Sequence, residues 1–405
     1  MEFWIREARV TKAPPLRMSK TRRILTAGAV CGLAFLLASC GPGGRFQSPG
    51  RPGATIGQPS GEIIGTGAVR VALLIPQSAP GNGPSAAAVF KNAAQLGLTE
   101  FPGADIQLLV KDTGGTAAGA NAAAQQALSE GAELILGPVF SQSVSGASQA
   151  ARSAGVPIIG FSSDASVAGR GVYLLSFLPQ DDVARMMSFA AQSGRTSIAA
   201  LFPQSEYGVI VEAAFRQEAA KNNLRIISIQ NYAASSDDIQ AKAKEIAKFS
   251  SRVDSIYFPG DPQAGIFIAQ ILTANGVDRN RVKFMGSGQW DNPSMFADSS
   301  LAGAWFPAPD RSGFGTFASK YQSTYGSRPP RNATLAYDAV TLAVGLVRSA
   351  GQRRFATGVL TNPDGFLGVD GIFRFRTNGS NERGLAVYEI GAGSSRVVSP
   401  ARRSF

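Results

Sequence analysis

The sequence predicts an α/β fold, and two observations support this prediction. Short apolar runs alternate with longer Ala-rich or amphipathic segments from residue 69 onward. Such alternation is typical of parallel sheets that carry helices on both faces. About 330 residues follow this point, which is long enough for two compact lobes.

The expected strands are short apolar runs bounded by turn residues, at 69–75, 106–110, 134–137, 157–160, 198–202, 225–229, 255–258 and 283–286. The expected helices lie between them, at 117–130, 144–154, 183–193, 206–222, 239–249 and 264–274. Turn residues such as Gly114-Gly115 and Gly137-Pro138 follow the strands. In doubly wound sheets, loops at the carboxyl ends of strands line the ligand crevice, so we expect site residues there.

The segment 18–39 has the three parts of an export signal: basic residues, an apolar stretch and small residues. We therefore expect Met18 to be the true start and residues 1–39 to be a signal peptide. The motif Leu37-Ala38-Ser39-Cys40 resembles the bacterial lipobox, which implies a lipid on Cys40. The alternative is a transmembrane anchor, but the roughly fourteen apolar residues are fewer than the ~20 that span a bilayer.

Residues 40–66 are expected to form the lipidated cysteine and a flexible linker, because they are rich in Gly, Pro and Ser. The only cysteines are Cys31 and Cys40, so no disulfide is expected in the domain that follows. The chain has no histidine, which excludes Ser-His-Asp and Cys-His catalysis and removes the usual zinc ligand. A Ser-Lys pair or a carboxylate pair stays open in principle, but no spacing singles one out. We expect a protein that is not an enzyme and holds no metal.

Cofactors and nucleic acid are not expected. Neither the GxGxxG nor the GxxxxGK[ST] pattern of phosphate-binding loops is present. The formal net charge is +11, but part of the basic excess lies near the ends of the chain, for example at Arg402 and Arg403. No compact basic run exists that would indicate a nucleic-acid surface.

Several motifs follow one another in a fixed order along the chain. They are Pro76 after the first strand, Asp112, Gly137-Pro138 with Ser141-Gln142-Ser143, Tyr207-Gly208, Tyr337-Asp338-Ala339, and Phe366-x-Gly368-x-x-Gly371-x-Phe373. In this order the chain resembles the Leu/Ile/Val-binding group of type 1 periplasmic binding proteins. The resemblance implies the two-lobed Venus flytrap form of the α/β fold, in which two mostly parallel sheets close over a ligand as a hinged clamp.

The resemblance also predicts the domain organisation, with crossovers between the lobes near 178–182, 306–311 and 359–366. The first lobe would then comprise 67–178 and 311–358. The second lobe would comprise 179–310 and 359–398. Residues 399–405 would form a tail, for which disorder is expected.

A ligand site between the lobes is a further implication of the resemblance. In amino-acid binders of this family, hydroxyls and backbone amides of the first lobe hold the ligand carboxylate. Here this role falls on Ser141, where a helix begins, and on Ser162, with Ser78 and Ser163 as further candidates. The alternative for Ser141 is that its hydroxyl only caps the helix. Asp164 stands where the family usually has a Thr hydroxyl, so we expect its carboxylate to be exposed or paired with a cation.

The family holds the ligand's amino group with a carboxylate and an aromatic ring from the second lobe. The acidic position falls here on Gly288 or Gln289, and the aromatic position falls near Asp261. Two alternatives stay open: Asp164 and Asp261 replace the lost carboxylate, or the site does not bind free amino acids. The remaining candidates for ligand contact are Tyr207, Gln289 and Trp290, and for Trp290 packing in the core is the alternative.

Some motifs fit a second group better. Leu136-Gly137-Pro138-Val139-Phe140-Ser141-Gln142 and Leu178-Pro179-Gln180-Asp181-Asp182 are similar to the outer-membrane lipoproteins that activate penicillin-binding proteins. Two functions are therefore predicted as alternatives. One is a solute receptor that delivers a small polar, amino-acid-like or peptide-like ligand to an ABC permease, as in branched-chain amino-acid transport. The other is a regulator of peptidoglycan synthesis whose partner is a penicillin-binding protein. Both act in the periplasm, and Gly41 after Cys40 favours the outer over the inner membrane.

Overall fold

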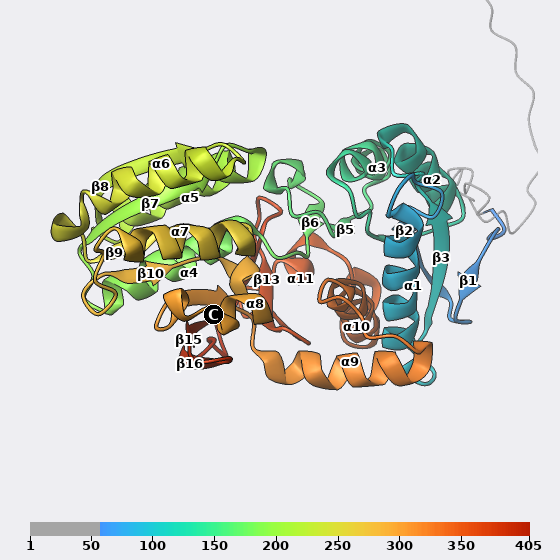
Figure 1. The fold of residues 1–405 in the computed structure, drawn as a ribbon. Coiled ribbons are helices and arrows are strands. Elements are labelled where there is room, and N and C mark those ends of the chain that lie inside the picture. Colours follow the sequence, from blue (N-terminus) through green and yellow to red (C-terminus); the bar gives the residue numbers. More distant parts are fainter. Residues whose placement is uncertain (1–56) are drawn as a thin grey trace, which may run out of the picture. The chain divides into compact units, whose positions relative to one another are not determined.

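The computed structural model describes residues 57–405, so Cys40 and the predicted export signal lie outside the described residues. The described part consists of two lobes, each built around its own sheet (Figure 1). In both sheets most neighbouring strands are parallel. The predicted α/β fold with two mostly parallel sheets is therefore confirmed.

The first lobe has a six-stranded sheet in the order β1-β3-β2-β4-β5-β6, in which only the edge strand β1 is antiparallel. Its strands are β1 (Ile63–Ile64), β2 (Val69–Ile75), β3 (Ile106–Asp112), β4 (Leu134–Leu136), β5 (Ile158–Gly160) and β6 (Val172–Leu174). Its helices are α1 (Gly83–Thr99), α2 (Ala117–Ser129), α3 (Ser141–Ala154), α9 (Arg311–Tyr325), α10 (Ala333–Ser349) and α11 (Thr357–Leu360).

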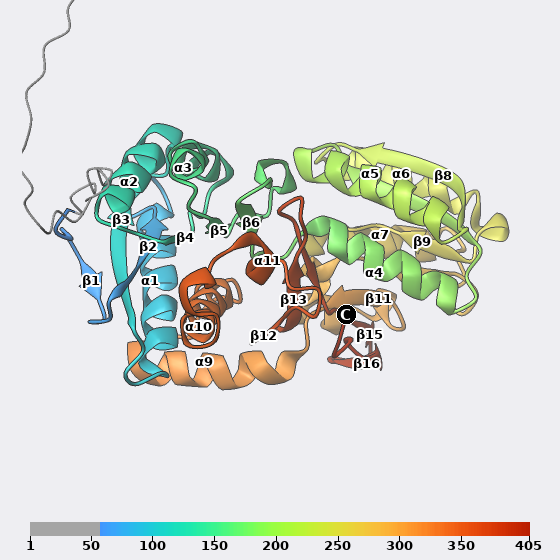
Figure 2. The same cartoon turned by 180° about the vertical axis from the view of Figure 1, so that it is seen from behind.

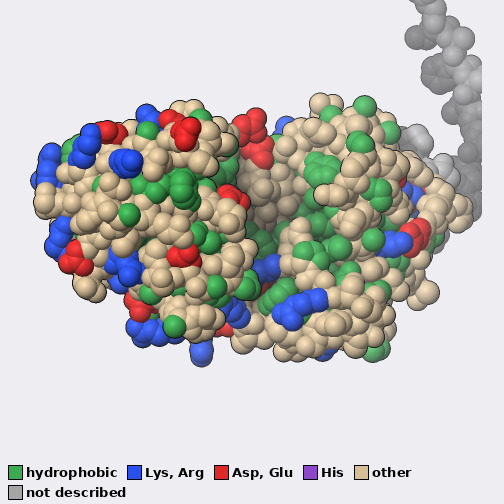
Figure 3. Space-filling model, viewed as in Figure 1, with side chains coloured by type: hydrophobic (Ala, Val, Ile, Leu, Met, Phe, Trp, Pro, Cys, Tyr) green, Lys and Arg blue, Asp and Glu red, His purple; other side chains and the backbone are tan. Residues whose placement is uncertain are grey.

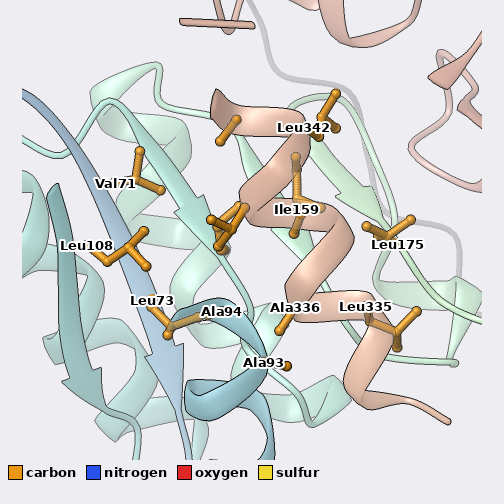
Figure 4. Close-up of a cluster of buried hydrophobic side chains, with 14 of the residues drawn as sticks. Val71, Leu73, Ala93, Ala94, Leu108, Ile159, Leu175, Leu335, Ala336 and Leu342 are labelled. Carbon is orange, nitrogen blue, oxygen red and sulfur yellow. The ribbon is translucent and has the colours of Figure 1, made fainter. Parts of the chain in front are cut away.

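The strands of this sheet are buried on both faces. Val71 and Leu73 of β2 belong to a core with α1 and α10, whereas Ala72 and Leu74 belong to a second core with α2 and α3. Figure 4 shows Val71 and Leu73 in the first of these cores, together with Ala93 and Ala94 of α1 and Leu335, Ala336 and Leu342 of α10. Because successive side chains of a strand point to opposite faces, a strand that is covered on both sides needs an uninterrupted apolar run.

The second lobe has a seven-stranded sheet in the order β16-β15-β11-β10-β9-β7-β8. Its strands are β7 (Ser197–Pro203), β8 (Arg225–Tyr232), β9 (Ser255–Tyr257), β10 (Lys283–Met285), β11 (Trp305–Ala308), β15 (Ala386–Ile390) and β16 (Ser395–Ser399). Helices α4 (Pro179–Gln192) and α5 (Glu206–Lys221) share one core with this sheet. Helices α6 (Ser236–Ala247), α7 (Pro262–Ala274) and α8 (Pro293–Ala297) share the opposite one.

A third, antiparallel sheet places the boundary between the lobes later in the chain than we predicted. It consists of β12 (Phe366–Gly368), β13 (Gly371–Phe375) and β14 (Asn381–Arg383), and it lies between the two larger sheets in both views (Figures 1 and 2). Phe373 and Phe375 belong to the core of the first lobe. The third crossover therefore follows β14, later than the 359–366 that we predicted, because two aromatic side chains hold β13 on the first lobe.

Both predicted flexible segments are ordered where the structure describes them. Residues 57–66 of the predicted linker include β1, and the Gly57 N–H donates to the Ser129 carbonyl at 2.9 Å. The predicted disordered tail begins within β16, and the Phe405 ring lies 4.4 Å from the Arg374 guanidinium. Within residues 57–405, no helix combines the length and the apolar character that a membrane crossing requires.

Candidate functional site

The crevice between the lobes contains two adjoining pockets, and Figure 3 shows the hollow that they occupy. The first-lobe pocket is lined by the loops after β4 and β5, including Val139–Gln142 and Phe161–Asp164. The interlobe pocket has a volume of about 680 Å³ and is lined by residues from both lobes and from the crossovers. Phe177, at the first crossover, lines both pockets, so the two pockets lie next to each other.

The predicted first-lobe residues gather in one place. Ser141, Ser162, Ser163 and Asp164 all line the first-lobe pocket. Ser141 is the first residue of α3, whose N-cap is Phe140 and which has no side-chain cap bond. The alternative that Ser141 only caps this helix is therefore wrong. Its hydroxyl and the unpaired N–H groups of the first helical turn face the same crevice wall, an arrangement that suits a carboxylate.

Ser162 and Asp164 are engaged in the structure of their own loop. The Ser162 hydroxyl is buried and accepts a hydrogen bond from the Asp164 N–H at 3.1 Å. The Asp164 carboxylate accepts from the Ser166 N–H at 2.9 Å and so caps a short 3-10 helix. Asp164 shows no cationic partner among the described ion pairs, and the carboxylate is half-buried at the pocket wall.

Ser78, a predicted ligand contact, lines neither pocket of the crevice. Its N–H donates to the Asp112 carboxylate at 3.2 Å, and the side chain is exposed outside both pockets. Its neighbours Ala79 and Pro80 line the first-lobe pocket instead. Ser78 therefore ties the loop after β2 to the end of β3 and presents no hydroxyl to the crevice.

The predicted second-lobe residues separate into two groups. Tyr207 and Gln289 line the interlobe pocket. The Tyr207 hydroxyl is hydrogen-bonded to the Ser287 side chain, and burial raises its pKa above the usual range of a tyrosine. Asp261 is the N-cap of α7, where its carboxylate accepts from the N–H groups of Gln263 and Ala264 at 2.9 and 3.1 Å. Asp261 thus satisfies a helix end, and it does not line either pocket.

Trp290 is fully buried in the core of the second lobe. This is the core packing that we gave as the alternative to ligand contact. Its ring lies 5.0 Å from that of Phe258. A Cβ atom on Gly286 would lie 2.1 Å from the indole, so the glycine makes room for the ring. The prediction that Trp290 stacks on a ligand is not met in this structure.

Asp182 is the acidic residue that the sequence prediction missed. It lies in the first turn of α4 and lines the interlobe pocket with Tyr207 and Gln289. Its Oδ2 accepts a hydrogen bond from the Gly288 N–H at 2.8 Å. A Cβ atom on Gly288 would lie 2.9 Å from the same oxygen. The Asp182 carboxylate of α4 therefore lies where a side chain on residue 288 would begin.

Burial is the main influence on the protonation of the Asp182 carboxyl group. Burial raises the pKa of this carboxyl to about 7, and the hydrogen bond from Gly288 lowers it only in part. A cation that entered the pocket would favour the ionised form. The pair Asp181-Asp182 directly after the first crossover is the sequence signal that could have located this residue.

A comparison with protein-family models matches residues 68–395 to the family described as periplasmic binding protein. No curated protein sequence gives a significant match. Many solved structures match this chain. The three described next share little sequence identity with it.

A structure from Rhodospirillum rubrum has been suggested to belong to a branched-chain amino acid ABC transporter. The match covers 82% of this chain and 100% of the Rhodospirillum rubrum chain, at 19% sequence identity and a TM-score of 0.72. A leucine-binding protein from Thermotoga maritima is similar over 82% of this chain and 99% of its own, at 20% identity and a TM-score of 0.57. A solute-binding protein from Rhodopseudomonas palustris in complex with 3,4-dihydroxybenzoic acid covers 83% of this chain and 97% of its own, at 16% identity and a TM-score of 0.56. At these identities the likeness concerns the fold.

Proposed function

Because the chain belongs to the periplasmic binding protein family, we propose that it is the solute-binding component of an ABC transporter and binds an amino-acid-like ligand between its lobes. The family consists of binding proteins, which agrees with the prediction that the chain is not an enzyme. Family membership also agrees with the prediction that the folded part works outside the cytoplasm.

The observation that carries this proposal is the pairing of two unlike walls across one crevice. On the first-lobe wall, Ser141 and the N-terminus of α3 offer hydroxyl and N–H donors. On the opposite wall, Asp182 offers a carboxylate beside the Tyr207 ring. An α-amino acid has one anionic and one cationic group on the same carbon, so its two groups match these two walls.

The role of Asp182 supports an amine in the ligand. A carboxyl group whose pKa is raised by burial gains a charge partner when an ammonium group binds, and binding then favours its ionised form. Asp164 and Asp261, the two predicted replacements for the missing carboxylate, bond instead to backbone N–H groups of their own helices. Of the three, only Asp182 lines the interlobe pocket, which supports it as the partner of the ligand's amino group.

The test is calorimetry and thermal unfolding of the full-length protein with a panel of free L-amino acids and, as ligands that lack an amine, benzoate and 3,4-dihydroxybenzoate. Saturable binding of an amino acid is expected, with a rise in the unfolding temperature. Asp182→Asn keeps an acceptor for the Gly288 N–H but removes the charge, and it should weaken the binding of the amino acid by about tenfold or more.

Asp261→Asn is the matched control, because it removes one carboxylate from the same lobe outside the pocket, and it should leave the affinity unchanged. Binding of benzoate alone, or equal effects of the two variants, would contradict the role of Asp182. A protein that binds no member of the panel but co-purifies with a penicillin-binding protein would contradict the transport function and favour a regulatory one.

The lipid on Cys40 is part of the same proposal, although this residue lies outside the described residues. We propose that the lipid tethers the protein to a membrane, with the outer membrane favoured because Gly41 follows the cysteine. Metabolic labelling with a fatty acid in the native cell tests it. The label should be present in the wild-type protein and absent from Cys40→Ser, and a labelled Cys40→Ser variant would contradict the assignment.

A further inference from the structure

The second lobe has a polar pocket that is lined by helices α4 and α5 and by the residues that follow β16. This α4–α5 pocket has a volume of about 690 Å³. Basic side chains outnumber acidic ones in its lining, and the basic ones are Arg185, Lys221, Arg376, Arg383 and Arg402. An excess of positive charge in a concave site favours an anionic ligand.

Arg185 of α4 has no carboxylate partner. Its Nε donates to the Leu385 carbonyl at 2.7 Å, and its Nη2 donates to the Ser399 hydroxyl at 2.6 Å. Its Nη1 has no hydrogen-bond partner among the described residues and is not buried. None of the ion pairs in the described part of the chain contains Arg185. Neutral acceptors thus hold this guanidinium in place and leave its charge unmatched.

Glu382, in the wall of the same pocket, is shared by three arginines. Its carboxylate lies 2.8 Å from Arg374, 3.2 Å from Arg376 and 3.1 Å from Arg402. The side chains of Arg376 and Arg402 line the pocket and are 49% and 53% exposed, so a ligand can reach them. One carboxylate balances only one of the three guanidinium charges, and the other two stay unmatched.

The charges of Arg185 and Arg402 act on each other. Burial lowers the pKa of the Arg185 guanidinium, and the positive charge of Arg402 lowers it further. Two groups that repel each other and line one pocket are stabilised by an anion that contacts both.

The remaining charged residues of the pocket do not contribute to this excess. Lys221 is paired with Glu218 at 3.1 Å, so their charges cancel. The terminal nitrogens of Arg383 are buried, and its charge is opposed by that of Asp181. Asp181 and Arg383 line the interlobe pocket as well, so an experiment has to distinguish the two pockets.

We propose that the α4–α5 pocket binds a phosphate monoester group, which is held by Arg185 and Arg402 with Arg376. Such a group carries about two negative charges near neutral pH and presents several acceptor oxygens. It can therefore accept hydrogen bonds from more than one guanidinium, and arginine matches phosphate oxygens with pairs of N–H groups. The inference does not depend on the ligand that we propose for the crevice.

Titration calorimetry of the full-length protein with inorganic phosphate and with glycerol 3-phosphate, at constant ionic strength, tests the inference. Saturable binding is expected. Arg402→Gln and Arg185→Gln should each weaken it about tenfold, because each removes a charged donor. Arg396→Gln is the matched control, since it also removes one arginine near the end of the chain. Arg396 is paired with Glu389 and lies outside the pocket, so this variant should keep the affinity.

Arg328→Gln distinguishes the two pockets, because Arg328 lines only the interlobe pocket. A loss of phosphate binding in Arg328→Gln but not in Arg402→Gln would place the anion in the crevice and overturn the inference. Equal losses in Arg402→Gln and Arg396→Gln would overturn it too, because they would indicate a general effect of charge.

Vesicles of phosphatidylcholine with and without phosphatidic acid distinguish a lipid headgroup from a soluble phosphate. Binding of either source that is lost in Arg402→Gln supports the site. The absence of binding to the soluble phosphates and to the vesicles would overturn the inference and leave the proposed function in place. If Arg185→Gln does not fold, Arg402→Gln decides, because its side chain is half exposed and contributes little to the core.

Discussion

Arg331 of the first lobe and Asp291 of the second lobe form an ion pair across the crevice, with 3.2 Å between Nη1 and Oδ2. Arg311 contacts the same carboxylate, and Asp370 binds the other side of the Arg331 guanidinium at 2.7 Å. One carboxylate of the second lobe is thus held by two arginines, Arg311 at the start of α9 and Arg331 shortly before α10. The pair is half-buried, so salt screens it less than a surface pair.

Asp291→Asn should lower the free energy of unfolding by about 1–2 kcal/mol, because two arginines lose their charged acceptor. Urea denaturation followed by circular dichroism measures it. The control is Lys248→Gln, which breaks the exposed pair with Glu245 and should cost less than about 0.5 kcal/mol. Equal losses in the two variants would show that the contact between the lobes adds no stability.

The stability of the protein should fall as the pH rises from about 5 to about 8. Burial raises the pKa values of Asp181, Asp182 and Asp338 to about 7, well above the 3.8 of a free aspartate. In this window the folded protein binds more protons than the unfolded chain, so each step up in pH favours unfolding.

Asp338→Asn tests this pH dependence, because the amide keeps an acceptor for the Val369 N–H. The loss of stability between pH 5 and pH 8 should be smaller in this variant than in the wild-type protein, as measured by urea denaturation. Asp237→Asn, at an exposed position, serves as the control. A wild-type protein that is more stable at pH 8 than at pH 5 would contradict the assigned direction of these pKa shifts.

Two glycine substitutions should change stability in opposite directions. Gly286→Ala places a Cβ atom 2.1 Å from the Trp290 ring and should cost about 2–3 kcal/mol. Gly345→Ala lies in an exposed part of α10 with no atom within 4 Å of the new methyl group, and it should gain about 0.5–1 kcal/mol. Thermal unfolding of both variants measures the shifts, and a Gly286→Ala protein as stable as the wild type would show that the indole has room to move.

Lys111 and Glu130 form a buried ion pair at 2.7 Å, with side chains 4% and 5% exposed. Glu130→Gln leaves the ammonium group without its counter-charge and should cost about 3 kcal/mol or more. The double variant Lys111→Met with Glu130→Met should cost less than this single change, because no uncompensated charge stays buried. A double variant that is less stable than Glu130→Gln would indicate that the pair itself is strongly stabilising.

The layered architecture could be predicted because its signal is local. The run Val69–Ile75 is apolar at every position except Arg70, since both faces of β2 are covered, and this pattern can be recognised without any tertiary information. The predicted helix and strand alternation lacked α1 and α9. The α1 sequence is rich in alanine and glycine, and α9 is rich in polar residues, so neither gave a clear apolar period.

The errors in the site have a common physical cause. Asp182 belongs to α4 but acts at Gly288, more than a hundred residues later, and only the packing of the two elements brings them together. The resemblance made Asp261 and Ser78 candidates for ligand contact, yet the Asp261 carboxylate accepts from the Gln263 N–H and the Ser78 N–H donates to Asp112. The loops after β4 and β5 could be predicted to line one pocket, whereas the choice of side chain depended on contacts between distant segments.

Residues 57–66 lie along the outer edge of the first lobe, on the side away from the crevice (Figures 1 and 2). Their hydrogen bonds go to Ser129, Lys111 and other residues of that lobe, and among the described residues none goes to the second lobe. A force applied through the preceding residues therefore enters the molecule at the first lobe alone. In a tethered protein the first lobe would act as the fixed arm of the clamp, and the second lobe as the arm that travels when a ligand is captured or released.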